Sequence, residues 1–351
     1  MSVDSLQLPR ARLDFIKPML AKPVENLPSG DGWLYELKLD GYRAQVLKRR
    51  GRVTLFSRRG NDLNARFPTI ARAFSFLADN SIVDGELVVL DEEGMPSFSA
   101  LQHLRFTPDS LYFYAFDLLA YEGKDLRKLS LTDRRRLLEG SAMKDMRDPV
   151  RLSAVFDASP NKLIAAAKQA GLEGVIGKRA GSRYESGERT GSWVKYKTNK
   201  GQELVIGGYK PGPNGFDYLL VGYYEGKALL FIAKVRNGFT PALRREVARN
   251  FPPLRTSQCP FANLPEPANA RRGEAITAEV MPKIQWLRPK LVAQIEFTEW
   301  TTNNHLRHSR FIALRDDKDP TAVRKEYASV IHGGAATEGR PYNHFRERGR
   351  K

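Results

Sequence analysis

A lysine that could act as a nucleophile stands near the N-terminal end of the chain. Lys38 lies within Glu36–Arg43, between an alternating apolar run and the turn-forming pair Asp40–Gly41. A lysine at a strand end, with an arginine five residues further on, can reach a phosphate group. The spacing Lys-x-Asp-Gly-x-Arg arises by chance in roughly one chain of this length in several hundred. An ordinary hairpin is the alternative for this segment taken alone.

Five further segments follow Lys38 in an order that is much more specific than the lysine motif. They are SRRGNDL (57–63), DGELV (84–88), YAFDLL (114–119), EGVIGK (173–178) and WVKYK (193–197). This series resembles the covalent nucleotidyltransferases, most closely the ATP-dependent DNA ligases of bacterial end-joining repair. The resemblance extends to LRHSRFIALRDDKDP (306–320). It implies an α+β fold: an antiparallel-sheet, ATP-grasp-like adenylyltransferase domain followed by a C-terminal OB-fold β-barrel.

The resemblance gives Lys38 a covalent role. Its amine would attack the α-phosphate of ATP, release pyrophosphate and keep AMP as a phosphoramidate. A free lysine has a pKa near 10.4, so only about one in a few thousand is unprotonated at neutral pH. We expect desolvation and the positive charges of Lys178, Lys195, Lys197 and a divalent metal to lower that pKa. Lys195 and Lys197 lie two apart on an expected strand, so they share a face and could hold the α-phosphate. Alternatively, Lys195 and Lys197 could lie on a solvated edge strand with no role in binding phosphate.

Three carboxylates are candidate metal contacts: Asp40, Glu86 and Glu173. Glu86 and Glu173 have apolar neighbours, where an unpaired carboxylate is costly unless it meets a cation or a sugar hydroxyl. The resemblance implies a ribose or metal contact for Glu86 and a metal contact for Glu173. Carboxylate and phosphate oxygens suit Mg²⁺ or Mn²⁺. We therefore expect ATP to bind together with one of these ions.

The resemblance also implies how the nucleotide is held. Phe116 would stack on the adenine ring; as a strand residue it could equally be plain core, but the close YAFDLL match favours stacking. Glu36 would read the purine edge, and Lys178 would join it in the nucleotide site. Arg315 and Lys318, in the last segment, would close over the triphosphate and orient the pyrophosphate leaving group.

Basic residues indicate a polyanionic partner. The chain carries 57 Lys and Arg against 40 Asp and Glu, a formal net charge of +17, which favours nucleic acid without proving it. By resemblance Arg43 and Arg58 would contact the nucleotide and the 5′-phosphate of a nick, because guanidinium binds phosphate in a bidentate fork. Basic residues beside aromatic ones also occur in the second half, as in DNA-binding OB-folds. These are Lys234, Arg236, Arg288 and Lys290. Taken as isolated clusters, these four residues could simply form solvated surface. The alternative for Arg58 is likewise a solvated surface arginine.

Hydrophobic periodicity predicts the elements that position these residues. Apolar alternation predicts an antiparallel meander over 33–57 and a helix over 67–77. Further strands are expected at 81–90, 111–120, 173–179, 193–198, 203–210, 217–224, 228–236, 274–281, 291–300 and 310–315. Two more helices are expected, one capped by Ser159–Pro160 and ended by Gly171, the other over 240–250.

Composition and termini bound the remaining expectations. We place an adenylyltransferase domain at 1–200, an OB-fold domain at 201–335 and a disordered basic tail at 336–351. Cys259, the single cysteine, excludes an internal disulfide and a cysteine-based zinc cluster. With no signal core and no apolar stretch approaching about 20 residues, we expect a cytoplasmic, monomeric protein that acts on nicked duplex DNA in the bacterial nucleoid. No polymerase or phosphoesterase segment is apparent, so end-joining or repair proteins would act in trans.

Other functions fit parts of the pattern. An RNA ligase or a GTP-using capping enzyme shares Lys-x-Asp-Gly, but YAFDLL and RFIALRDDK argue against both. A catalytically inactive DNA-end-binding protein could keep the basic surface, although every expected charged position is present. An NAD-dependent ligase would need a preceding nicotinamide-binding domain and a cysteine cluster. The favoured function is nick sealing by lysyl-AMP and DNA-adenylate intermediates, all of them phosphoryl transfers that depend on positioning and electrostatics.

Overall fold

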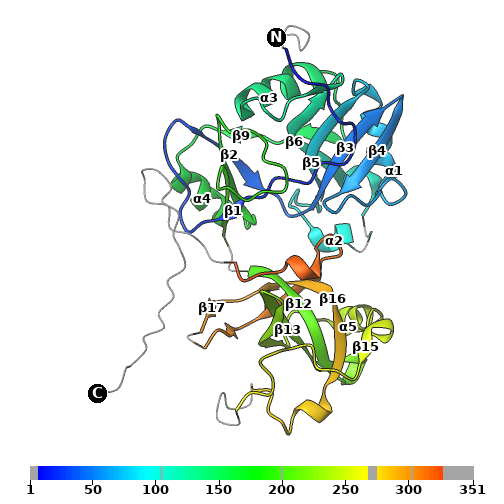
Figure 1. Ribbon diagram of the computed structural model, residues 1–351, viewed down its shortest axis with the longest axis vertical. Coiled ribbons are helices and arrows are strands. Elements are labelled where there is room, and N and C mark those ends of the chain that lie inside the picture. Colours follow the sequence, from blue (N-terminus) through cyan, green and yellow to red (C-terminus); the bar gives the residue numbers. More distant parts are fainter. Residues whose placement is uncertain are drawn as a thin grey trace.

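The structure, a computed structural model, describes residues 7–102, 104, 106–198, 201–267, 275–301 and 303–326. Three main β-sheets make up most of it, with short helices against them (Figure 1). The α-helices are α1 (Pro68–Ala73), α2 (Phe98–Gln102), α3 (Leu131–Leu137), α4 (Pro160–Gln169) and α5 (Pro241–Ala248). Short 3₁₀ turns occur at Phe74–Phe76, Pro108–Ser110, Pro213–Gly215, Pro252–Leu254, Met281–Lys283 and Pro320–Ala322, and a π-helical turn at Leu138–Ala142.

The first sheet has the strand order β4-β3-β5-β6-β7, with β8 parallel to β6. Its strands are β3 (Tyr42–Arg49), β4 (Arg52–Ser57), β5 (Ser81–Val89), β6 (Leu111–Tyr121), β7 (Lys124–Asp125) and β8 (Val150–Leu152). Side chains alternate between the faces of a strand, and one face packs on Phe67, Ile70 and Phe74 in and around α1. The helix expected over 67–77 and the strands expected over 81–90 and 111–120 are confirmed.

The second sheet holds the strand that carries Lys38. Its order is β1 (Lys22–Pro23), β11 (Trp193–Lys197), β10 (Gly174–Arg179), β2 (Trp33–Lys38) and β9 (Val155–Phe156). The expected meander over 33–57 is confirmed for β3 and β4, which pair antiparallel in the first sheet, and is wrong for β2, which pairs with β10 and β9. The chain changes sheet at Gly41, where a Cβ atom would collide with the carbonyl oxygen of Leu87. Only glycine fits this crossing.

The third sheet has the order β14-β13-β12-β16-β15, and β19 also pairs with β16. Its strands are β12 (Gly201–Lys210), β13 (Tyr218–Glu225), β14 (Ala228–Val235), β15 (Arg255–Thr256), β16 (Gln285–Glu296) and β19 (Arg310–Leu314); β17 (Glu299–Trp300) and β18 (Leu306–Arg307) form a separate pair. The strand expected over 274–281 is wrong for its described part. There the N–H groups of Val280 and Met281 both bond to the Thr277 carbonyl, which closes a turn. The strand begins later, at Gln285.

The two later helices are confirmed. Pro160 lies in the first turn of α4, and Gly171 follows its end at φ +67°, the left-handed conformation common after helices. Ser159 occupies the N-cap position, but its hydroxyl accepts no capping bond. The Thr240 hydroxyl does cap α5, accepting from the N–H of Leu243.

Strand β19 joins the two halves of the chain. Phe311 packs in the core of the third sheet, whereas Ile312 and Ala313 pack against the core of the first. Helix α2 lies against β19 at this junction (Figure 1). The residues after β19 are therefore held against the N-terminal half. The domain boundary near Gly201 stays a prediction, and the tail expected at 336–351 lies outside the described residues.

Candidate active site

Lys38 ends β2 and lies against β10. The antiparallel register pairs Lys38 with Gly174, which brings the preceding side chain, Glu173, next to it. A Cβ at Gly174 would collide with the Tyr196 carbonyl of β11, so glycine allows the close strand approach. Lys38 Nζ donates a hydrogen bond to a carboxylate oxygen of Glu173, and both side chains are about one-fifth exposed. The pair lies at the edge of a cavity of about 140 Å³.

This cavity gathers expected site residues from both halves of the chain. It is lined by Lys38, Asp40, Arg43, Arg58, Glu86, Glu173, Lys195, Lys197, Arg315 and Lys318. Residues that are 277 positions apart, Lys38 and Arg315, thus face one space. The expected phosphate contacts and the expected metal contacts both lie beside the nucleophile.

A second cavity, of about 120 Å³, is also lined by Lys38 and contains the expected base contacts. Phe116 is half-buried and lines it, whereas Phe113 and Ala115 on the same strand are fully buried. The Phe116 ring therefore belongs to the cavity wall, and it also packs against the buried cluster that contains Trp193. Lys178 Nζ lies 4.3 Å from the centroid of Phe116 and 4.5 Å from that of Trp193, distances typical of cation–π contacts.

Glu36 lies in the floor of this second cavity and is almost fully buried. Its Oε1 accepts from Lys178 Nζ at 2.7 Å and from Arg135 Nη1 at 3.1 Å, and its Oε2 accepts from Ser153 Oγ at 2.7 Å. Burial lowers the pKa of Lys178, although the carboxylate of Glu36 opposes the shift. The buried carboxylate is thus matched by cations and a hydroxyl.

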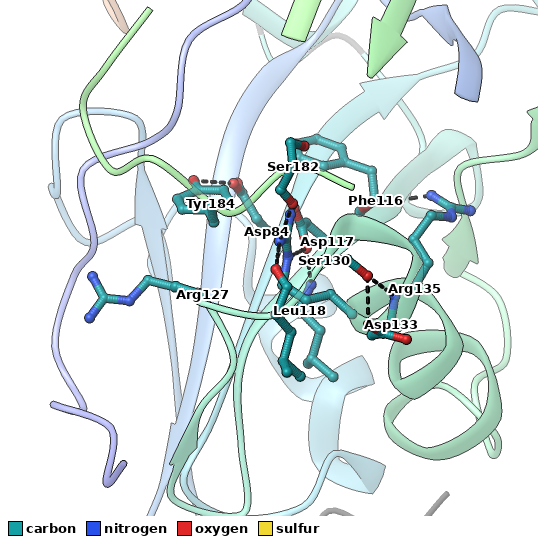
Figure 2. A network of polar contacts seen from close by, with 12 residues as sticks. Asp84, Phe116, Asp117, Leu118, Arg127, Ser130, Asp133, Arg135, Ser182 and Tyr184 are labelled. Carbon is teal, nitrogen blue, oxygen red and sulfur yellow. Dashed lines mark hydrogen bonds and ion pairs between the residues drawn. The ribbon is translucent and has the colours of Figure 1, made fainter. Parts of the chain in front are cut away.

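Arg43 makes several hydrogen bonds to other protein groups, which the sequence did not suggest. Its guanidinium donates two hydrogen bonds to Asp84, one to the Met19 carbonyl and one to the Tyr184 hydroxyl. Tyr184 in turn donates to Asp84 at 2.6 Å (Figure 2). Burial lowers the pKa of Arg43, but the charge of Asp84 outweighs it and raises the pKa overall. Its role in contacting nucleotide or DNA stays a prediction, because these bonds occupy much of the fork.

Arg58 faces the Lys38 cavity and also a larger one of about 870 Å³. Burial and the neighbouring charge of Arg43 lower its pKa. The larger cavity is lined with further basic residues: Lys17, Lys22, Arg59, Arg189, Lys195, Lys318, Arg324 and Lys325. Four acidic residues, Glu203, Asp317, Asp319 and Glu326, line it as well. The basic residues outnumber them, so the lining keeps the positive charge that a phosphate chain would require.

Lys195 and Lys197 project from one face of β11 and share a carboxylate. Lys195 Nζ lies 2.7 Å from Glu326 Oε1, and Lys197 Nζ lies 3.4 Å from Glu326 Oε2. Burial and the charge of Lys197 lower the pKa of Lys195 to about 8. Burial alone would raise the pKa of Glu326, but the two lysines hold it at about 2. The chain's own carboxylate therefore neutralises the expected α-phosphate contacts.

The segment after β19 reaches the same cavity through ion pairs. Arg315 makes two hydrogen bonds to Asp317, at 2.8 and 2.9 Å, and lies 3.8 Å from Asp40. Lys318 Nζ lies 2.9 Å from Glu203 at the start of β12. Arg66 Nη1 donates to Asp316 at 2.8 Å; Arg66 precedes α1 in the N-terminal half. The expected leaving-group contacts are thus already close to Lys38.

The three expected metal contacts line one cavity without forming a ready cluster. Burial raises the pKa of Asp40 to about 6 and that of Glu86 to about 7. For Glu173, burial raises the pKa but the charges of Lys38 and Lys197 lower it overall. Within the described residues, no group of three or more Asp, Glu, His or Cys is arranged to hold a metal. Asp40 and Glu86, two half-buried carboxylates with raised pKa values, fit a cation that takes its other ligands from phosphate and water.

The four basic residues expected on the C-terminal half lie apart from these cavities. Lys234 Nζ and the Arg236 guanidinium are 5.3 and 4.5 Å from the ring centroid of Tyr218. Arg288 and Lys290 are exposed on β16. Strands β12 and β13 separate β16 from β14 in the sheet. The two pairs would therefore contact a long ligand at different points, and their role stays a prediction.

Two family descriptions match this sequence. "ATP dependent DNA ligase domain" matches residues 18–197, which is 180 of the 351 residues, and "ATP dependent DNA ligase C terminal region" matches residues 213–318. This chain belongs to the ATP-dependent DNA ligase family. The expected nucleotidyltransferase domain with a C-terminal ligase domain is therefore confirmed at family level, and the ligase is an ATP-dependent enzyme by that membership.

Named relatives agree. The ligase is 38% identical over 322 residues to the multifunctional non-homologous end joining protein LigD of Pseudomonas aeruginosa, covering 89% of this chain and 37% of that protein. It is 37% identical over 320 residues to the LigD DNA repair protein of Mycobacterium tuberculosis, covering 89% and 40%. DNA ligase C1 of Mycolicibacterium smegmatis is 29% identical over 333 residues, covering 88% and 92%. The chain spans about two-fifths of the LigD proteins.

A solved structure matches as well. The structure titled mycobacterial DNA ligase D complexed with ATP and MES has a TM-score of 0.63 and 34% sequence identity, and the match covers 89% of the ligase and 98% of that chain. In the described part of the ligase, no helix has the length and apolar character needed to cross a bilayer.

Several residues of the site come from outside the motif series, among them Arg135, Ser153, Glu203 and Glu326. Each reaches a motif residue far along the chain; Glu36 and Arg135 are 99 positions apart, and Lys195 and Glu326 are 131 apart. Spacing rules cannot predict such pairs. One signal was present, because Arg135 stands at a core-facing position of α3, where an arginine requires a buried acceptor.

Proposed function

We propose that the ligase seals nicks in duplex DNA through a lysyl-AMP at Lys38. One observation carries this: the lysine lies between a base-sized cavity walled by Phe116 and a phosphate-sized cavity lined by Lys195 and Lys197. A nucleotide with its base in the first and its phosphates in the second would bring the α-phosphate to the Lys38 amine. Proximity of this kind converts a bimolecular step into a unimolecular one.

The reaction would proceed in three displacements. The Lys38 amine attacks the α-phosphorus, the bond to pyrophosphate breaks, and the amine loses its proton. The 5′-phosphate of the nick then attacks the same phosphorus, the P–N bond breaks, and the lysine regains a proton. Finally the 3′-hydroxyl attacks the DNA 5′-phosphorus and AMP leaves. Arg315 and Lys318 would stabilise the departing pyrophosphate only in the first displacement.

A divalent cation, Mg²⁺ or Mn²⁺, would supply additional positive charge beside the phosphates. Asp40, Glu86 and Glu173 are the chain's candidate contacts for it. Binding of the cation by Glu173 would also affect Lys38, because the Glu173 carboxylate accepts a hydrogen bond from Lys38 in the structure. Separation of that pair must precede attack by the amine.

End joining is the proposed context. Proteins named for non-homologous end joining share 37–38% identity with most of the ligase. The match covers about two-fifths of the length of those proteins, so the proposal concerns the nick-sealing step alone. The antiparallel sheet of the C-terminal half, with an inserted α5, supports an OB-fold there, and its exposed Arg288 and Lys290 would contact the duplex.

Labelling with [α-³²P]ATP tests the proposal. Incubation with Mg²⁺ or Mn²⁺ should give a labelled protein band that survives denaturation, and addition of a nicked duplex should remove the label and yield sealed product. [α-³²P]GTP should not label the chain. DNA binding should weaken steeply with salt, with a log–log slope of about −0.9 for each phosphate neutralised, and Arg288→Gln with Lys290→Gln should flatten that slope. An unlabelled protein would overturn the proposal.

A further inference from the structure

The Glu36 carboxylate is nearly saturated by the chain's own donors. A carboxylate offers about four lone-pair positions. In the described residues, Lys178 and Arg135 take both positions of Oε1, and Ser153 takes one of Oε2. One acceptor position therefore stays open, on Oε2, in a side chain that lines the base-sized cavity.

Arg135 braces three walls of that cavity at once. Its Nη1 donates to Glu36 Oε1. The same Nη1 lies 3.4 Å from the Phe116 carbonyl oxygen (Figure 2). Its Nη2 donates to the Ser153 carbonyl at 2.9 Å and to Glu139 at 3.0 Å. The side chain is only 6% exposed. A planar guanidinium with fixed donor directions holds these groups in one geometry, which a lysine could not do.

Ser153 is fixed by the backbone on both sides. It stands between β8, which pairs with β6 of the first sheet, and β9, which pairs with β2 of the second. Its own N–H donates to the Ala115 carbonyl at 2.8 Å. The hydroxyl therefore has little freedom, and it donates to Glu36 Oε2 from the point where the two sheets meet.

The neighbouring arginine shows what a purely structural contact looks like. Arg134 is completely buried and makes two hydrogen bonds to Asp117, with others to the carbonyls of Leu129 and Ser182. None of these partners lines the base-sized cavity. Arg134 joins α3 to the sheet, whereas Arg135, the next residue along the helix, donates to the Glu36 carboxylate.

We propose that Arg135 and Ser153 are positioning residues that hold the Glu36 carboxylate with one acceptor open to the base, so that the ligase selects purines with an amino group at C6. This rests on the proposed function of nucleotide transfer to Lys38. An amino group at C6 donates to the open position on Oε2. A C6 oxygen would instead place an acceptor against a carboxylate that cannot turn away, and a site of this kind discriminates strongly.

The test compares three nucleotides in self-adenylylation: ATP, inosine triphosphate and purine riboside triphosphate, which has no substituent at C6. Ser153→Ala should lower kcat/KM for ATP by about tenfold, the size of one hydrogen bond to a charged group, mainly through KM. Purine riboside triphosphate should be almost unaffected, because it makes no bond to Glu36. The preference for ATP over both analogues should fall accordingly.

Arg135→Lys should also reduce the ratio of kcat/KM for ATP to kcat/KM for each analogue, since it keeps the charge and loses the planar guanidinium. Ser153→Thr keeps the hydroxyl and should retain the wild-type ratio. Arg136→Gln is the matched control, because Arg136 is exposed on the same helix and, among the residues that the structure describes, forms an ion pair with Asp133 alone. It should leave all three nucleotides unchanged.

The outcomes separate two failures. If Ser153→Ala lowers kcat/KM equally for all three nucleotides, or for none, the positioning role is wrong. Equal loss would identify general damage to the site. If the wild-type protein takes no label from any of them, the proposed function itself fails.

Discussion

The base side and the phosphate side of the site are built differently. On the base side, Glu36 and Phe116 stand on strands that are paired within two sheets, and the ion pairs of Glu36 with Lys178 and Arg135 are buried in the wall. On the phosphate side, each expected contact pairs with an acid: Lys195 and Lys197 with Glu326, Lys318 with Glu203. Backbone pairing makes a rigid pocket before any ligand arrives. Ion pairs can exchange one anion for another.

Exchange is the property that a phosphate site requires. A buried ion pair is costly to break when one charge is left alone, but an incoming phosphate replaces the carboxylate as a partner. The two sides therefore differ in what substitution should do. Changes on the base side should act through geometry, and changes on the phosphate side should act through competition and closure.

The largest effect should come from the residue where the two sides meet. Lys38→Ala removes the only proposed nucleophile, so covalent AMP labelling should disappear. Sealing of a nick that already carries 5′-AMP should persist in part, because the amine is required only before that point. Gel assays with [α-³²P]ATP and with pre-adenylylated DNA measure both. Lys162→Ala, at an exposed position on α4, is the control; labelling of Lys38→Ala at the control level would exclude the assignment.

The phosphate side should show its largest effect in the first step. Lys318→Ala and Arg315→Ala should slow self-adenylylation by several orders of magnitude through lost leaving-group stabilisation, while sealing of a pre-adenylylated nick stays within about tenfold. Lys227→Ala, in the exposed β13–β14 turn, should change neither. If both reactions fell equally, a defect in folding or DNA binding would be the better account.

The same contrast explains what the sequence could predict. The motif series and its resemblance predicted Lys38, Glu173 and Phe116 as site residues, and strand pairing explains why they line adjoining cavities. The strand over 274–281 was wrong because turn bonds to Thr277 override an alternating pattern. β2 was assigned to the wrong sheet, since hydrophobic alternation does not specify the partner strand. Glu203 and Glu326 were missed because ion pairs across the chain leave no local pattern.

A smaller effect concerns the stability of the base side. The pKa of Glu86 is raised by burial from 4.5 to about 7, so between those pH values the folded protein binds more protons than the unfolded chain. Its free energy of unfolding should therefore fall as pH rises through that window. Glu86→Gln removes this contribution, and wild type should lose about 1–3 kcal/mol relative to the variant.

Urea unfolding of both proteins at pH 4.5 and pH 7.5, with EDTA present to remove cations, measures this difference. Asp40, whose pKa is also raised, is present in both proteins, so its contribution largely cancels in the comparison. Parallel pH profiles would show that Glu86 is not destabilised by burial, and the base side would then be less dry than the structure indicates.

The smallest effect should separate competition from closure on the phosphate side. Glu326 neutralises Lys195 and Lys197, so ATP must displace its carboxylate to reach them. Glu326→Gln leaves both lysines without that competitor, and KM for ATP in self-adenylylation should fall by about three- to tenfold, as expected from losing roughly 1 kcal/mol of competing ion pair. The difference from wild type should shrink as salt rises. Glu299→Gln, which breaks the exposed pair with Arg307, should leave KM unchanged. A higher KM in Glu326→Gln would instead mean that the carboxylate helps to hold the two halves together around the nucleotide, and the phosphate side would then depend on closure more than on exchange.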